Sequence, residues 1–323
     1  MFHIRSLAIS RVIAAIFLLM FFHQPAFSHL PPEPPNETQE YRAFWVDAFN
    51  SVYRTPAEVS AIVNAARAAN LNAIILQVRK RGDAFYNSNF EPKAAGVAAD
   101  FDPLADMIAK AHDTNAGPRI EIHAWIVSYH IWNSTNAPAN PNHPFNLYPG
   151  WLSKDESGVM WDGGNYTFDQ GHPDVQRHTY NVCMDLVSRY DIDGINFDYI
   201  RYSSPQWGYN DVTVARFNEQ FSRNGVPASG DETWKQFRRD QITGLVRKVY
   251  LNTMAIKPHV KVSVDAITFA PGITNLSGWY TSSAWTSVLQ DWRGWMEEGM
   301  IDLAMPMAYF RHHEPARALD YER

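Results

Sequence analysis

Cysteine is nearly absent from this sequence of 323 residues, which contains Cys183 alone. A single cysteine excludes an internal disulfide, and its helical context predicts that the Cys183 thiol is buried as a small hydrophobic group. The folded chain must therefore depend on the packing of its core. A single large domain of this length can bury enough apolar surface to do so.

Positive charge is also scarce, with 28 Lys and Arg against 34 Asp and Glu, which gives a net charge of −6. Proteins that bind nucleic acid need a basic face, so we expect no nucleic-acid partner. The metalloprotease patterns HExxH and HxxEH are missing, and we expect neither a catalytic metal nor another cofactor. The G-x-S-x-G elbow of esterases is missing as well.

No apolar run is long enough to span a bilayer. A basic start precedes an apolar run over 12–22, and small residues at 26–28 (Ala-Phe-Ser) resemble a cleavage site. We therefore expect a signal peptide over 1–28 and a secreted or periplasmic protein without stable membrane insertion after cleavage. An uncleaved anchor is the alternative. A Pro-rich linker is expected over 29–40, followed by one domain over 41–323.

Apolar segments alternate with amphipathic ones along the rest of the chain. Strands are predicted at 42–49, 73–78, 120–127, 194–199, 260–267 and 301–308. Helices are predicted at 55–70, 102–111, 173–190, 212–222, 232–255 and 285–298.

Six alternating strand and helix units predict an α/β fold with a parallel sheet. The first strand is not followed by a Gly-rich turn, which favours a closed (β/α)8 barrel of the TIM type over an open nucleotide-binding sheet. The chain ends just after the sixth strand, so we expect a barrel truncated there. Long loops at 133–171 and 201–211 follow strands three and four, on the face where barrel active sites form.

The segment 191–202 (DIDGINFDYIRY) carries the sharpest local signal. Side chains alternate along a strand, so Asn196 and Asp198 project to the same side. Asp198 at the strand's carboxyl end is predicted to be the central catalytic carboxylate, with Arg201 keeping it ionised. A structural ion pair that fixes the loop is the alternative. Asn196, Arg201 and Tyr202 are predicted to contact substrate.

The third strand places His123 and Trp125 on one face. His123 is predicted to bind hydroxyl groups and Trp125 to stack on a ring, although a buried core histidine is the alternative for His123. Glu121, deeper in the same strand, is interpreted as structural.

The second, fifth and sixth strands supply the remaining candidates. Gln77 and Arg79, with Asp83 on the next loop, form either a substrate-positioning cluster or a solvated basic turn. Asp265 is a candidate second carboxylate near the end of the fifth strand. Tyr309 is a candidate wall of the site.

Several of these stretches resemble the glycosyl-hydrolase-like family 10 proteins, once catalogued as domain of unknown function 187, distant relatives of α-amylase-type barrels. The matching stretches occur in the family's order over about residues 41–310. They are Arg42–Val46, Gln77–Arg79, Gly82–Tyr86, Glu121–Trp125, Pro149–Leu152, Asp169–Pro173, Asp193–Tyr202 and Asp302–Tyr309.

The resemblance implies a (β/α)8 barrel that acts on glycans outside the cytoplasm. It also implies a link to bacterial peptidoglycan, including glycan strands stripped of their peptides. By analogy with α-amylase-type barrels, Asp198 falls at the nucleophile position on strand four and Asp265 falls near the acid on strand five. Asn196 stands where those enzymes carry an arginine.

The sequence therefore predicts an exported glycoside hydrolase of the retaining type. Asp198 would attack or stabilise the anomeric carbon, and Asp265 or Asp83 would protonate the leaving oxygen. High aromatic content, 14% of residues, fits stacking on sugar rings, with a Trp-rich core as the alternative. A non-catalytic glycan-binding protein and a metal-dependent polysaccharide deacetylase are the alternatives.

Overall fold

The computed structural model describes residues 40–50, 52–269, 273, 275–309 and 313–314. The predicted signal peptide and all but the last residue of the predicted linker lie outside these ranges. Among the described helices, none is both long enough and apolar enough to cross a membrane.

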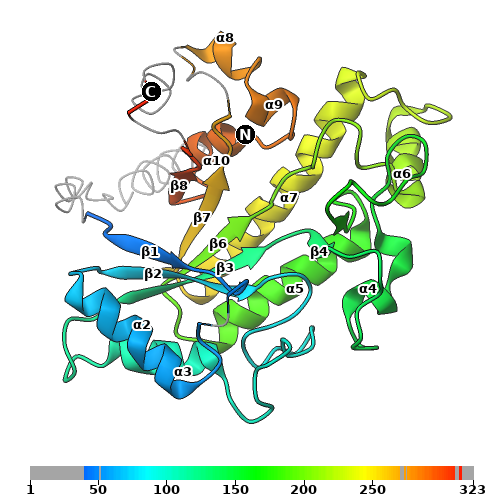
Figure 1. Ribbon diagram of the computed structural model, residues 1–323. Coiled ribbons are helices and arrows are strands. Elements are labelled where there is room, and N and C mark those ends of the chain that lie inside the picture. Colours follow the sequence, from blue (N-terminus) through cyan, green and yellow to red (C-terminus); the bar gives the residue numbers. More distant parts are fainter. Residues whose placement is uncertain (1–39, 51, 270–272, 274, 310–312, 315–323) are drawn as a thin grey trace, which may run out of the picture. The chain divides into compact units, whose positions relative to one another are not determined.

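Six parallel strands form the central sheet, as predicted (Figure 1). In spatial order they are β1 (Ala43–Val46), β2 (Ala73–Arg79), β3 (Glu121–Val127), β6 (Gly194–Asp198), β7 (Lys261–Ala266) and β8 (Leu303–Pro306). Each strand pairs with its neighbour in parallel, and β1 and β8 are the edges within the described chain. The arrangement is an open half-barrel of (β/α) units.

Helices connect the strands, and several of them lie along the sheet (Figure 1). They are α2 (Pro56–Ala68), α3 (Pro103–His112), α5 (Pro173–Arg189), α6 (Asp211–Phe221), α7 (Glu232–Ile256), α8 (Leu276–Trp279), α9 (Ser283–Thr286) and α10 (Trp292–Glu297). The predicted start and end of α2 are confirmed. Thr55 caps the Glu58 amide, and Asn70 has the positive φ of 54° that ends such a helix.

Alternation along the strands separates the two faces of the sheet. The face toward the helices is apolar and buried, with residues such as Leu76, Ala124 and Phe197. The opposite face, the inside of the half-barrel, becomes polar toward the carboxyl ends of the strands, where Asp198 and Asp265 lie. The two-residue alternation of side chains thus places these polar residues together on the inner face.

The helix predicted at 285–298 is confirmed only in part, because the chain is broken there into α9 and α10. Between them, Leu289 takes a left-handed φ of 55° and Gln290 is fully buried. The Gln290 side chain accepts from the Ile267 amide at 2.9 Å and donates to the Asp265 carbonyl at 3.0 Å. The break therefore supports the carboxyl end of β7.

The loop predicted at 133–171 contains structure of its own. Two short antiparallel strands, β4 (His130–Trp132) and β5 (Tyr166–Thr167), flank α4 (Pro144–Leu147) and the 3-10 turn η1 (Pro149–Trp151).

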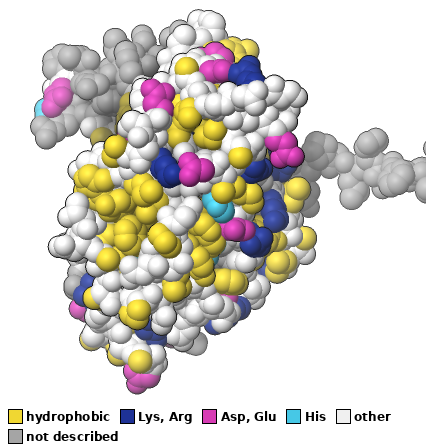
Figure 2. All heavy atoms as spheres, turned by 90° about the vertical axis from the view of Figure 1, so that its right-hand side faces the viewer, with side chains coloured by type: hydrophobic (Ala, Val, Ile, Leu, Met, Phe, Trp, Pro, Cys, Tyr) yellow, Lys and Arg dark blue, Asp and Glu magenta, His cyan; other side chains and the backbone are white. Residues whose placement is uncertain are grey.

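On the side that faces right in Figure 1, where α4 and α6 lie, hydrophobic side chains gather in patches between charged ones (Figure 2).

Candidate active site

Asp198 and Asp265 lie side by side at the carboxyl ends of adjacent strands. Register pairs Asn196 with Ser263 and Phe197 with Val264, so Asp198 and Asp265 continue the same ladder. Both side chains project into the half-barrel, and neighbouring strands are about 4.8 Å apart. The Asn196 amide donates to Asp265 Oδ1 at 3.2 Å and joins the two strands.

Three donors surround the Asp198 carboxylate. Its Oδ1 accepts from the Tyr199 amide at 2.7 Å and from Arg201 Nη1 at 3.5 Å, while Oδ2 accepts from Trp125 Nε1 at 3.2 Å. Burial raises the pKa of Asp198 above its usual value, and the Arg201 charge opposes this rise. The predicted contact between Arg201 and Asp198 is present, but it lowers the pKa of Asp198 by less than burial raises it.

Asp265 is the more weakly hydrogen-bonded carboxyl group of the pair. Burial, followed by the negative charge of Asp198, raises the pKa of Asp265 to about 8. Asn196 is the side-chain donor that opposes this rise. Asp265 therefore holds a proton at neutral pH, while Asp198 has the donors that favour an anion.

Tyr199 fixes the geometry between the pair and the solvent. Its φ of 50° is left-handed, and its amide donates to Asp198 Oδ1. One face of its ring packs on His130, with ring centroids 3.9 Å apart, and the Arg201 guanidinium lies 4.2 Å from the ring centroid. Burial lowers the pKa of His130 to about 4, so the imidazole is neutral at neutral pH.

A cavity of about 300 Å³ opens beside this cluster. Its walls include His130, Tyr199 and Arg201, together with Asp162 and Asn165 from the excursion after β3. Arg201 lines this cavity and also contacts Asp198, but neither Asp198 nor Asp265 is among the residues that line it. A few polar groups around a pocket of this size suit one or two sugar rings.

Arg79 lies in a different place from the one expected of a substrate contact. Its side chain is 2% exposed and pairs with Glu91 at 2.7 Å. Its remaining donors reach the carbonyls of Val127 and Ser128, beyond the end of β3. Burial opposes ionisation of Glu91, but Arg79 and His178 keep the Glu91 pKa below its usual value. Arg79 therefore stabilises the carboxyl end of β3 from a buried position.

Three other candidates are also buried. His123 is fully buried and shares a 3.0 Å hydrogen bond with Glu121, which matches the alternative of a core histidine. Gln77 is fully buried and accepts from the Ala48 amide at 2.7 Å. Tyr202 is fully buried as well, beside the guanidinium of Arg238.

The last candidates lie near the surface. Asp83 accepts from the Arg81 amide at 2.9 Å and so shapes its own loop. Tyr309 is 81% exposed, so most of its ring faces solvent.

The sequence did not lead us to predict a role at the site for Trp45 or Gln290. Trp45 is 44% exposed on the inner face of β1 and meets the Trp125 ring edge-on, with ring centroids 5.1 Å apart. Alternation along the first strand places Trp45 on the inner side, and this pattern could have indicated it. The role of Gln290 had no local signal, because its partners lie more than twenty residues away in the chain.

Within the described part of the chain, no group of three or more His, Cys, Asp and Glu side chains is arranged to hold a metal ion. The expectation that catalysis needs no metal stays a prediction.

Carboxyl groups at the carboxyl ends of neighbouring parallel strands, on (β/α) units, are an arrangement found in barrel enzymes, glycoside hydrolases among them. Solved structures support this fold. An α-L-fucosidase isoenzyme from Paenibacillus thiaminolyticus matches 70% of this chain and 32% of its own, at 19% identity and a TM-score of 0.54. The PgaB (BpsB) glycoside hydrolase domain from Bordetella bronchiseptica matches 83% of this chain and 74% of its own, at 13% identity and a TM-score of 0.54.

The chain belongs to the glycosyl hydrolase-like 10 family, whose sequence profile matches residues 40–323. The resemblance inferred from the motifs is thereby confirmed. Glycosyl hydrolase YngK of Bacillus subtilis is 26% identical over 87% of this chain, and glycosyl hydrolase DigH of Escherichia coli K12 is 25% identical over 92%. The chain spans 56% of the length of YngK and 71% of that of DigH.

Proposed function

We propose that this protein hydrolyses O-glycosidic bonds in a polysaccharide, with Asp198 as nucleophile and Asp265 as general acid and base. The observation that carries the proposal is the pair itself. Two carboxyl groups lie side by side at the ends of adjacent strands. Burial raises the pKa of both, but Asp198 has more hydrogen-bond donors, and its negative charge raises the pKa of Asp265 further, so Asp198 ionises first. Such a division is what two-carboxylate glycoside hydrolysis requires.

Chemistry begins when Asp198 attacks the anomeric carbon while Asp265 gives its proton to the departing glycosidic oxygen. A covalent glycosyl ester forms on Asp198. Asp265, now ionised, takes a proton from water, and the resulting nucleophile releases the sugar from Asp198. We propose that anomeric configuration is retained, the outcome of enzymes whose two carboxyl groups lie about 5 Å apart.

Substrate positioning would involve the groups around the cavity. Arg201 is held against the Tyr199 ring and can direct its remaining donors to sugar hydroxyls. The exposed rings of Trp45 and Tyr309 border the inner face and offer flat apolar surfaces to pyranose rings. The family supports a glycan as the class of substrate.

The finer identity of the substrate rests on the sequence resemblance. We propose peptidoglycan glycan strands without peptides as the first substrate to test. The basic start, short apolar run and small residues before position 29 support export to the periplasm or the medium.

The test compares the wild-type protein with Asp198→Asn on peptide-free glycan strands, with soluble fragments measured by mass spectrometry. We expect release by the wild type and a loss of at least roughly a thousandfold in the variant. Equal turnover by both would remove Asp198 from the mechanism. Binding by both without any release would favour a non-catalytic glycan-binding protein, and loss of activity with a chelator would favour a metal-dependent deacetylase.

A further inference from the structure

Arg201 forms an ion pair with Asp198, but this contact is weak by itself. Arg201 Nη1 lies 3.5 Å from Asp198 Oδ1, which is longer than a typical hydrogen bond. The guanidinium also packs on the Tyr199 ring, with its central carbon 4.2 Å from the ring centroid. In the part of the chain that the structure describes, no other side chain forms a hydrogen bond or ion pair with this guanidinium. The Tyr199 ring is therefore the surface against which Arg201 is held.

His130 packs against the same Tyr199 ring. The two ring centroids lie 3.9 Å apart, and the ring planes are inclined by 37°. Burial, followed by the charge of Arg201, lowers the pKa of His130 to about 4, so the imidazole beside the guanidinium is neutral at neutral pH. The imidazole forms no hydrogen bond with any described residue, so ring packing is its main contact with the protein. A flat, uncharged ring of this kind can restrict Tyr199 without repelling Arg201.

The backbone fixes the position of His130 relative to the end of β6. The Ser128 amide, two residues before His130, donates to the Asp198 carbonyl at 2.8 Å. His130 itself pairs with Thr167 in the antiparallel ladder of β4 and β5. The imidazole is thus carried by a segment that is tied to Asp198 through the main chain, and it can act as a fixed support for a neighbouring ring.

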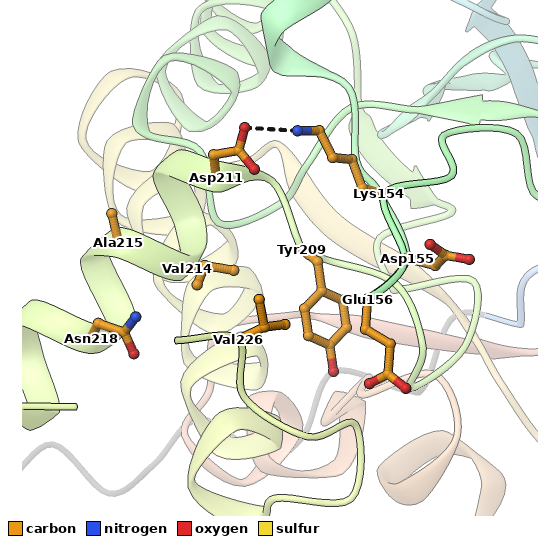
Figure 3. A pocket seen from close by; sticks show the side chains of 10 residues that line it. Lys154, Asp155, Glu156, Tyr209, Asp211, Val214, Ala215, Asn218 and Val226 are labelled. Atoms are coloured by element: carbon orange, nitrogen blue, oxygen red, sulfur yellow. Dashed lines mark hydrogen bonds and ion pairs between the residues drawn. The ribbon is translucent and has the colours of Figure 1, made fainter. Parts of the chain in front are cut away.

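Other parts of the excursion after β3 are held by contacts that do not involve His130. Lys154 Nζ and Asp211 Oδ2 form an ion pair at 2.7 Å, which Figure 3 marks with a dashed line. Asp155 also forms a backbone bridge with Trp207. Loss of the His130 ring should therefore leave this region in place and act locally, on the ring that it contacts.

We propose that His130 is a positioning residue: through the Tyr199 ring it holds the Arg201 guanidinium beside the Asp198 carboxylate. The side-chain oxygens of Asp198 accept from Tyr199, Arg201 and Trp125, and His130 is not among these donors. The role of Asp198 as nucleophile rests on the proposed function, whereas its ionisation does not. Because a nearby guanidinium favours the carboxylate anion, loss of the support should make Asp198 harder to ionise.

NMR titration of the protein with isotope-labelled aspartate carboxyl groups measures this ionisation, and Asp198→Asn assigns the signal. We expect His130→Ala to raise the lower apparent pKa of the Asp198 and Asp265 pair by roughly one unit. His130→Phe keeps a flat neutral ring and should restore the wild-type value. His130→Leu removes the flat ring while it keeps bulk, and gives the same comparison if the alanine variant does not fold.

His259→Ala is the matched control. His259 is exposed and precedes the amino end of β7, at the opposite end of that strand from Asp265. The apparent pKa values of the pair should not change in this variant.

A double variant shows whether the effect depends on Arg201. Arg201→Met removes the guanidinium and should raise the same apparent pKa at least as far as His130→Ala does. Adding His130→Ala to Arg201→Met should then cause no further rise, because the group that His130 positions is gone. Hydrolysis gives a separate readout, since the acidic limb of kcat/KM against pH should move with the NMR value in each variant.

Three results would overturn the proposal. The first is an unchanged pKa of Asp198 in both His130→Ala and His130→Leu. The second is an equal rise on His130→Ala with and without Arg201. The third is a rise in His130→Phe as large as that in His130→Ala, since the flat ring would then not be what is needed. A protein that shows the expected pKa shifts but hydrolyses no glycan would reject the proposed function and leave the role of His130 standing.

Discussion

Trp125 donates its indole N–H to Oδ2 of Asp198 at 3.2 Å, so a residue of β3 helps to set the charge of the carboxylate at the end of β6. The sequence predicted that Trp125 would stack on a sugar. In the structure it is 9% exposed and serves the carboxylate, while its neighbour Trp45 presents the exposed ring.

Trp125→Phe should therefore raise the pKa of Asp198, because the anion loses a donor that lowers it. We expect the acidic limb of kcat/KM against pH to move upward by roughly one unit and the optimum rate to fall about tenfold. Trp132→Phe is the control, since its indole donates to the Asn136 carbonyl at 2.6 Å, in the exposed chain after β4. Identical profiles for both variants would contradict this role.

Asp265→Asn should make the folded protein more stable at neutral and alkaline pH. The pKa of Asp265 is raised to about 8 from 3.8, so the unfolded chain ionises this group first and is favoured as pH rises above about 3.8. Asparagine cannot ionise and can still accept from Asn196. The gain should be absent at low pH, grow by about 1.4 kcal/mol per pH unit above about pH 4 and level off above about pH 8. Urea unfolding across this pH range measures it, and a constant difference at every pH would refute it.

Gly194→Ala should destabilise the sheet. A Cβ at Gly194 would lie 2.2 Å from Nδ1 of His123, which is itself fully buried. Overpacking of this kind costs about 1–3 kcal/mol. Gly244→Ala is the control, because a Cβ there meets no atom within 4 Å on α7 and should stabilise by about 0.5–1 kcal/mol. Thermal unfolding of both variants gives the comparison.

Arg79→Met should lower the free energy of unfolding by about 3–5 kcal/mol, because Glu91 would be left buried without its main partner. Adding Glu91→Leu should recover most of the loss. Chemical denaturation of the single and double variants measures the coupling. A single variant of normal stability with a raised KM would instead favour the substrate contact that the sequence suggested.

Local periodicity was sufficient to predict most of the fold and the position of Asp198. Strand alternation put Asn196 and Asp198 on one face, and the run of (β/α) units gave the parallel sheet. How deeply each inward-facing side chain is buried could not be predicted from periodicity. His123 and Gln77 face the correct side, but whether they reach a cavity depends on residues from distant segments that cover them.

Long-range partners explain the rest of the differences. Glu91 pairs with Arg79 from a loop, and Gln290 interrupts a helical pattern to bond β7. Neither contact has a sequence spacing that could reveal it. The left-handed Tyr199, a non-glycine residue, was equally hidden, because its conformation is imposed by the contacts of Asp198, His130 and Arg201.

The dependence of kcat/KM on pH tests the central claim most directly, with peptide-free glycan strands or any glycan that the wild-type protein cleaves. Hydrolysis needs ionised Asp198 and protonated Asp265, so the pair predicts a bell-shaped profile. Its alkaline limb should have an apparent pKa of about 8, and its acidic limb should lie above the usual value for an aspartate. A rate that continues to rise past the alkaline limb would contradict the assignment of Asp265 as the acid.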